Sequence, residues 1–166
     1  MIKARVYVLI LLFFFLSSGC SLGNDSAAER GRDSAPEFKL YDLEDNPVSL
    51  RDYKGVKPVL LIFWTTWCPY CRLALRSLKD NYGFYSDMGV EVLAINTGES
   101  GKKVSSFVEG FDLEFKSLLD LDAQVAHDYN VLGVPTYFLI SKESKIIFKG
   151  NRLPEARLEE LLSGQE

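Results

Sequence analysis

The chain has 166 residues, of which 47% are hydrophobic and 25% charged, and its formal net charge is -4. This length suits about one domain, and the near-average composition predicts a packed core rather than a disordered chain. The negative charge, and the absence of a long basic run or a Gly-rich phosphate loop, give no reason to expect nucleic-acid binding.

Residues 1–19 are predicted to be a lipoprotein signal peptide. Lys3 and Arg5 precede a short apolar run, residues 6–16, and small residues follow it, which is typical of an export signal. The run is short for a membrane span, which needs about 20 residues. An uncleaved anchor helix is the alternative.

Cys20 is predicted to carry a lipid. The LSSGC segment resembles a bacterial lipobox, whose cysteine is acylated, although Leu16 stands four residues before Cys20 where the family more often has leucine three before. Ordinary secretion, with Cys20 free or removed, is the competing interpretation. If Cys20 is acylated, residues 20–35 form a lipidated cysteine and a flexible tether. The protein would be lipid-anchored on the extracytoplasmic side of the cell envelope, where disulfides persist.

The folded domain is predicted over residues 36–166. In chain order, its elements are an edge hairpin (37–40 and 48–50), a buried strand (59–64), a helix (69–85), a second buried strand (90–95), short helices (104–108 and 123–129), a second hairpin (136–140 and 146–148) and a last helix (153–162). A βαβ unit implies parallel strands, and the later hairpin adds an antiparallel edge. This order predicts an α/β fold with a mixed sheet between helices.

The CPYC segment carries the chemistry. Cys68 is predicted to be the N-cap of the helix that Pro69 begins, where free N–H groups and the helix dipole favour a thiolate. Cys71 lies one turn on, on the same helix face, and begins its apolar stripe. We therefore expect an exposed Cys68 to attack a partner disulfide and a more buried Cys71 to release the partner. The reverse reaction would oxidise a dithiol.

Two other uses of the cysteine pair are weaker. A zinc site needs about four ligands, and the chain adds only Cys20 and His127, a histidine expected on a helix surface. No metal or other cofactor is therefore expected. A static structural disulfide would close a very small loop and would restrict the unfolded chain little.

A second motif, LGVPT at residues 132–136, precedes a predicted strand. Proline at such a position is unusual inside a sheet, and a cis bond before Pro135 would leave the Val134 backbone free to pair with an incoming chain. The alternative is an ordinary proline at a strand start. Val134 and Pro135 are predicted to contact the substrate. Trp67, directly before Cys68, and Tyr70, between the two cysteines, are predicted to contact it as well.

Residues 36–150 resemble the thioredoxin-like family of membrane-tethered, extracytoplasmic thiol-disulfide oxidoreductases, the TlpA/ResA type. The segments PVLLIFWTTWCPYC, SLLDLDAQVAHDYNVLGVPTYFLI and IIFKG carry the resemblance. It implies a thioredoxin-like fold with an N-terminal β-hairpin and a short helical insert near residues 101–110, a nucleophilic Cys68 and a cis Pro135 beside the disulfide. It also implies a membrane electron donor and substrates such as apocytochromes during cytochrome c maturation.

The chain departs from that family at two positions. Ile62 stands where thioredoxins often carry an acid, and Ala74 stands where reducing members of the tethered family often carry a glutamate. Each acid helps move protons to and from the buried cysteine. The Pro-Tyr dipeptide resembles the glutaredoxin type, and this dipeptide tunes the redox potential.

The leading prediction is a disulfide reductase for exported proteins, expected to be a monomer. A disulfide oxidase or isomerase is the alternative within the class. A thiol peroxidase is a further alternative: Thr65 fits the peroxiredoxin pattern, but Leu61 occupies its proline position. A binding domain without catalytic activity is the last alternative.

Overall fold

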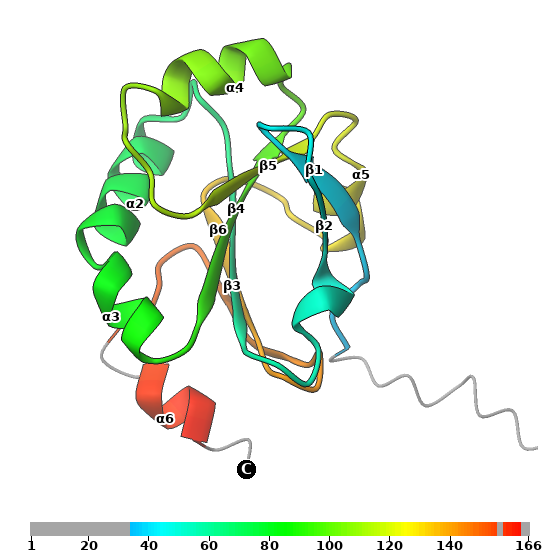
Figure 1. Cartoon of the computed structure of the whole chain (residues 1–166), viewed down its shortest axis with the longest axis vertical. Helices are drawn as coiled ribbons and strands as arrows, with labels where there is room; N and C mark the ends of the chain where they lie inside the picture. The colour runs from blue at the N-terminus through cyan, green and yellow to red at the C-terminus, as the bar shows by residue number, and fades with distance from the viewer. Residues whose placement is uncertain (1–33, 156–157, 164–166) are drawn as a thin grey trace, which may run out of the picture. The chain divides into compact units, whose positions relative to one another are not determined.

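The computed structural model describes residues 34–155 and 158–163 (Figure 1). The predicted signal peptide, Cys20 and tether residues 21–33 lie outside the described residues. Within the described ranges, no helix has the length and apolar character needed to cross a bilayer.

The described residues form both strands and helices. The strands are β1 (Lys39–Asp42), β2 (Pro47–Ser49), β3 (Val59–Trp64), β4 (Glu91–Thr97), β5 (Lys116–Asp120), β6 (Thr136–Ile140) and β7 (Ile146–Gly150). The helices are the 3-10 helix η1 (Leu50–Tyr53) and the α-helices α2 (Pro69–Asp80), α3 (Tyr82–Asp87), α4 (Gly101–Val108), α5 (Gln124–Asp128) and α6 (Leu158–Ser163).

The strands form one seven-stranded mixed sheet in the order β2-β1-β5-β4-β3-β6-β7. Strands β3, β4 and β5 run parallel, whereas β6, β7, β1 and β2 pair antiparallel with their neighbours. The predicted α/β fold, both hairpins and the parallel β3–β4 pair are therefore confirmed.

Strand β3 lies inside the sheet and is covered on both faces. Leu60, Ile62 and Trp64 face a core that includes buried residues of α2, α3, α4 and α6. Leu61 and Phe63 face a second core, built with the β1–β2 hairpin, η1 and α5. Figure 1 shows α2 and α3 on one side of the sheet and the hairpin and α5 on the other. Burial of such a side chain contributes about 1.5–3 kcal/mol, which explains the uninterrupted apolar sequence.

Strand β5 was missed by the sequence analysis. Its apolar pair, Leu118 and Leu119, is too short to show a strand period and lies between polar residues. The last of these, Asp120, is fully buried because its carboxylate accepts hydrogen bonds from the backbone N–H groups of Val125 (3.1 Å) and Ala126 (2.9 Å) in α5. From the sequence alone, a buried aspartate that is hydrogen-bonded in this way cannot be distinguished from an exposed loop residue.

Two predicted boundaries differ. The helix predicted over residues 69–85 is divided at Asn81, whose side-chain amide donates to the Ser77 carbonyl (2.9 Å) and caps α2. Leu153 and Pro154 lie outside α6. At the N-terminal side, two residues assigned to the tether already contact the domain: Ser34 pairs with Lys145, and Ala35 is buried.

Candidate active site

Cys68 is the N-cap of α2, as predicted. Its backbone is extended (φ -82°, ψ 113°), and Pro69 follows as the first helical residue. The Cys71 backbone N–H donates to the Cys68 sulfur at 3.3 Å. The sulfur therefore accepts a hydrogen bond from the first turn of the helix, at the positive end of the helix dipole.

The predicted exposure of Cys68 is wrong, because only 5% of the residue is accessible. The cause is the chain segment before β6. The Val134–Pro135 peptide bond is cis, as predicted, and the Cys68 thiol lies 3.5 Å from the Val134 carbonyl oxygen, to which it donates. The sulfur thus lies between the start of α2 and the cis-proline segment.

Cys71 is completely buried, so the prediction that it is the less accessible sulfur is confirmed. Both cysteines are free thiols. Burial raises the pKa of Cys71 to about 12, and its interaction with Cys68 acts in the same direction, whereas a hydrogen bond from the Thr65 backbone acts against them. Cys71 is consequently a protonated thiol at neutral pH.

The surroundings of Cys71 provide no carboxylate at the two positions where related proteins often have one. Ile62 is fully buried in the core, and Ala74 is 9% exposed on α2. Tyr137 pairs with Ile62 across β3 and β6, and burial raises the pKa of Tyr137 to about 12, with the Cys71 charge as a further cause. Tyr137 therefore remains a neutral hydroxyl.

Exposed apolar side chains flank the cysteines and the cis-proline segment in the sequence. Trp67 is 65% exposed and Tyr70 is 73% exposed, and their contact with a substrate stays a prediction. Leu132 is 93% exposed and was not predicted, although its position directly before Gly133-Val134-Pro135 was a signal for it. Trp64, in contrast, is completely buried and packs against Phe107.

The loop between β3 and Cys68 is held by two residues that the sequence analysis missed. The Thr66 backbone N–H donates to Glu99 (2.6 Å), and Arg72 donates twice to the Thr66 carbonyl oxygen (3.1 and 3.2 Å). A signal existed for Glu99: it follows β4, and the carboxyl ends of parallel strands β3 and β4 meet at one edge of the sheet.

Three further sequence expectations concern other chemistry. His127 lies on α5 with 84% of its side chain exposed, as predicted. Within residues 34–155 and 158–163, no group of three His, Cys, Asp or Glu side chains could hold a metal ion. In the same part of the chain, the buried Thr65 hydroxyl has no hydrogen-bond partner.

Known proteins with similar sequences and folds show the family to which the chain belongs. Residues 32–149 match the AhpC/TSA family. The thiol-disulfide oxidoreductase ResA of Bacillus cereus is 36% identical over 164 residues, covering 95% of this chain and 92% of that protein.

Two solved structures support the same assignment. The thioredoxin domain of a thiol-disulfide oxidoreductase from Bacteroides vulgatus is 28% identical, with a TM-score of 0.69 over 78% of this chain and 95% of that one. A secreted Mycobacterium tuberculosis disulfide oxidoreductase, homologous to E. coli DsbE, is 25% identical, with a TM-score of 0.64 over 76% of this chain and 95% of that one. The chain therefore belongs to the AhpC/TSA family and, by its similarity to the ResA proteins, to the thioredoxin-like thiol-disulfide oxidoreductases.

Proposed function

We propose that this oxidoreductase reduces disulfides of exported proteins outside the cytoplasm, with Cys68 as the nucleophile and Cys71 as the resolving thiol. The observation that carries this proposal is the unequal placement of the two sulfurs. The Cys68 sulfur caps α2 and accepts the Cys71 N–H, whereas Cys71 is fully buried with a pKa raised to about 12.

The reaction is a two-step exchange. The Cys68 thiolate attacks one sulfur of the partner disulfide; a Cys68–partner disulfide forms, and the departing partner sulfur takes up a proton. Cys71 then loses its proton and attacks the Cys68 sulfur. The Cys68–Cys71 disulfide forms, the second partner sulfur leaves as a thiol, and two electrons have passed to the partner. A dithiol donor in the membrane would return the enzyme to its reduced state.

The substrate is proposed to bind along the cis-proline segment. The Val134 carbonyl lies at 3.5 Å from the attacking sulfur, so a chain that pairs with the Val134 backbone would bring its own disulfide to Cys68. Trp67, Tyr70 and Pro135 would supply apolar contacts beside that chain. These contacts suit a flexible, cysteine-bearing segment, as in an apocytochrome before haem attachment.

The direction of electron flow is proposed from the resemblance to the membrane-tethered ResA type, which includes reducing members. Strong oxidants of this fold have a stabilised reduced form, chiefly through the thiolate of the nucleophilic cysteine, so the potential of the Cys68–Cys71 pair decides the direction. Equilibration of the purified domain with glutathione tests this: the reductase proposal requires a potential well below that of the glutathione couple, and a potential near that of strong oxidants contradicts it.

The membrane association is proposed from the lipobox-like segment at Cys20 and the apolar export signal before it. Metabolic labelling with palmitate tests the lipid, because the label should be incorporated into the wild-type chain and be absent from Cys20→Ala. Equal labelling of both chains would contradict acylation at this residue.

A trapping experiment tests the proposed roles of the cysteines and identifies the substrates. Cys71→Ala should accumulate mixed disulfides with envelope proteins, because the second attack is removed, and Cys68→Ala should accumulate none. The captured proteins would show whether cytochrome maturation is the physiological task. Equal capture by the two variants would contradict a nucleophilic Cys68 and favour binding without exchange.

A further inference from the structure

We propose that Glu99 is a positioning residue for thiol-disulfide exchange, because its carboxylate fixes the loop that leads into Cys68. This inference rests on the proposed function and names a residue outside the CPYC and cis-proline motifs. The loop runs from Thr65 to Trp67, between the end of β3 and the N-cap of α2.

The Glu99 carboxylate is buried, with 8% of the residue exposed, and each of its oxygens accepts two hydrogen bonds. One oxygen accepts from the Thr66 backbone N–H (2.6 Å) and from the Asn96 side-chain amide (2.9 Å). The other accepts from the Thr66 hydroxyl (2.8 Å) and from the Lys103 ammonium (2.6 Å). Charged hydrogen bonds of this kind are short and directional, so the carboxylate fixes the Thr66 main chain and its side chain together.

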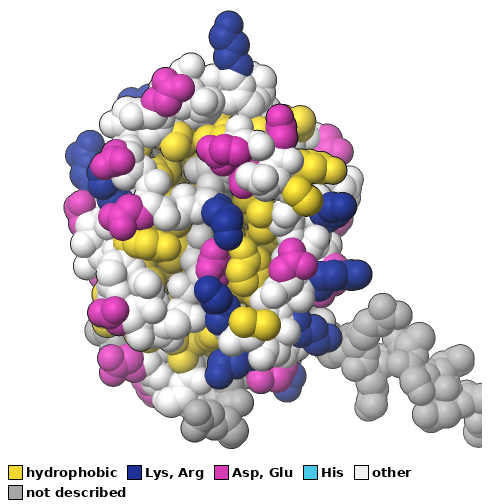
Figure 2. Space-filling view, viewed as in Figure 1, with side chains coloured by type: hydrophobic (Ala, Val, Ile, Leu, Met, Phe, Trp, Pro, Cys, Tyr) yellow, Lys and Arg dark blue, Asp and Glu magenta, His cyan; other side chains and the backbone are white. Residues whose placement is uncertain are grey.

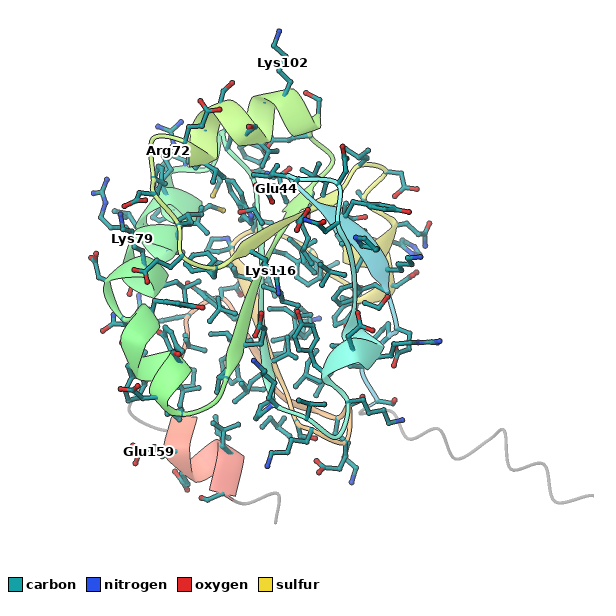
Figure 3. All side chains as sticks on the ribbon, in the orientation of Figure 1. Glu44, Arg72, Lys79, Lys102, Lys116 and Glu159 are labelled. Atoms are coloured by element: carbon teal, nitrogen blue, oxygen red, sulfur yellow. The ribbon has the colours of Figure 1, made fainter. Side chains whose placement is uncertain are left out.

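Arg72 holds the same residue from its other end. Its guanidinium donates through two nitrogens to the Thr66 carbonyl oxygen, at 3.1 and 3.2 Å, and its backbone N–H donates to the Cys68 carbonyl. The guanidinium also lies over the Phe107 ring of α4, 5.5 Å from its centre. In Figure 3 the Arg72 side chain lies where α2 approaches α4. The Glu99 carboxylate and the Arg72 guanidinium therefore hold Thr66 from its two ends, two residues before Cys68. These contacts of Glu99 and Arg72 with Thr66 are called the clamp.

The clamp has a direct link to both sulfurs. The backbone of Thr65, the residue before Thr66, lowers the pKa of Cys71, and Cys68 follows the loop directly. A shift of the Thr66 peptide would move Thr65 and the N-cap residue together. Exchange requires a near-linear approach of three sulfurs, and small displacements of reacting groups cost rate steeply.

Glu99 does not replace the acids missing at Ile62 and Ala74. Burial opposes its ionisation, but the bonds from Lys103, Asn96 and Thr66 outweigh burial and lower the pKa of Glu99 to about 2. A carboxylate that remains ionised at neutral pH and already accepts four hydrogen bonds is unsuited to carry a proton during turnover. Its contribution is therefore geometric.

The test compares Glu99→Gln with Glu109→Gln, a matched change at an exposed glutamate that follows α4 and whose carboxylate accepts a hydrogen bond from the Ser105 hydroxyl. The readout is the second-order rate constant for reaction of the reduced, full-length protein with oxidised glutathione, measured from pH 5 to 9 and referred to the folded fraction. We expect Glu99→Gln to react at least about tenfold more slowly, with an unchanged pH profile, because the loop is displaced. Glu109→Gln should react as the wild type does.

Two variants at Thr66 leave the Glu99 carboxylate in place and serve as a second test in case Glu99→Gln fails to fold. Thr66→Val removes the hydroxyl at nearly constant shape and should slow exchange several-fold, whereas Thr66→Ser keeps both donors and should restore the rate. Glu99→Gln combined with Thr66→Val should lose little more than the worse single variant, because both changes break one clamp.

Several results would overturn the proposal: wild-type rates in folded Glu99→Gln, equal rates for Thr66→Val and Thr66→Ser, or a slower Glu99→Gln whose pH profile has moved, which would indicate an effect of charge. The proposed function fails separately. If wild-type protein reacts no faster than free cysteine, or if Cys68→Ala reacts equally well, the assignment of Cys68 is wrong whatever the Glu99 variants do.

Discussion

Cys68 and Cys71 are three residues apart, yet their surroundings give the two sulfurs different chemistry. The first accepts a helix N–H and touches the cis-proline segment, and the second is sealed in the core that α2 forms with β3. The sequence predicted which sulfur is more buried, because Cys71 begins an apolar stripe. It did not predict that Cys68 is also shielded from solvent, because the segment that shields it, at Val134, lies more than sixty residues later in the chain.

The proton of Cys71 gives a prediction at the residue scale. With a pKa of about 12 and no acid at position 74, loss of this proton should limit the second step at neutral pH. Ala74→Glu places a carboxylate one turn further along α2 and should speed release of the partner thiol by about 10²-fold, the lower range for general-base catalysis. Ala74→Gln adds the same volume without a base and should not. Single-turnover release of a thiol-labelled peptide measures the step, and equal rates in the two variants would contradict this account.

Glu99 gives a second residue-scale prediction, on stability. Its pKa falls from 4.5 to about 2 on folding, so the ionised group stabilises the native state by up to about 3 kcal/mol. For a lowered carboxyl pKa, this contribution is complete above pH 4.5 and is lost as the pH falls towards 2. The difference in unfolding free energy between the wild type and Glu99→Gln should therefore be largest at pH 6–7 and shrink below pH 4.5. Urea titrations at pH 6 and pH 3 measure it, and a pH-independent difference would argue against the carboxylate contacts.

Elements with a strong local pattern were predictable from sequence. The uninterrupted apolar residues of β3 indicated a strand covered on both faces, and Pro69 after Cys68 marked the start of α2. Strand β5 and the Glu99–Thr66 contact were not predictable in this way. Both depend on buried polar groups whose partners lie on other elements, and no local periodicity reports such partners.

Asp120 supports a prediction at the element scale, because it joins the end of β5 to the start of α5. Asp120→Ala leaves two backbone N–H groups of α5 without their acceptor and should lower the unfolding free energy by about 1–3 kcal/mol. Asp122→Ala, at an exposed carboxylate with one hydrogen bond to the Gln124 N–H, should cost less. Denaturant titration of both variants tests this, and equal losses would mean that Asp120 contributes no special link.

At the scale of the whole domain, Cys68 and Ser34, the first described residue, lie at opposite ends of the sheet. Cys68 follows the carboxyl end of β3, whereas Ser34 pairs with Lys145 in the β6–β7 turn, beside the strand position where Ile140 pairs with Val59 at the start of β3. Figure 1 shows that turn at the end of the sheet opposite α4. Within the described domain, Cys68 therefore lies at the opposite end of the sheet from Ser34.

The face of the domain that Figure 2 shows carries both kinds of charged side chain. On the face seen in Figure 2, basic and acidic side chains are interspersed rather than segregated. The sequence carries a net charge of -4.

The inequality of the two sulfurs exists only in the folded molecule, so alkylation before and after unfolding tests the central claim most directly. The reduced protein is treated with iodoacetamide at pH 7, and each cysteine is quantified by peptide mass spectrometry. We predict that Cys68 is alkylated in the native protein while Cys71 stays protected, and that both react once the chain is unfolded in urea. Equal labelling of the two in the native protein, or earlier labelling of Cys71, would contradict the assignment of Cys68 as the nucleophile.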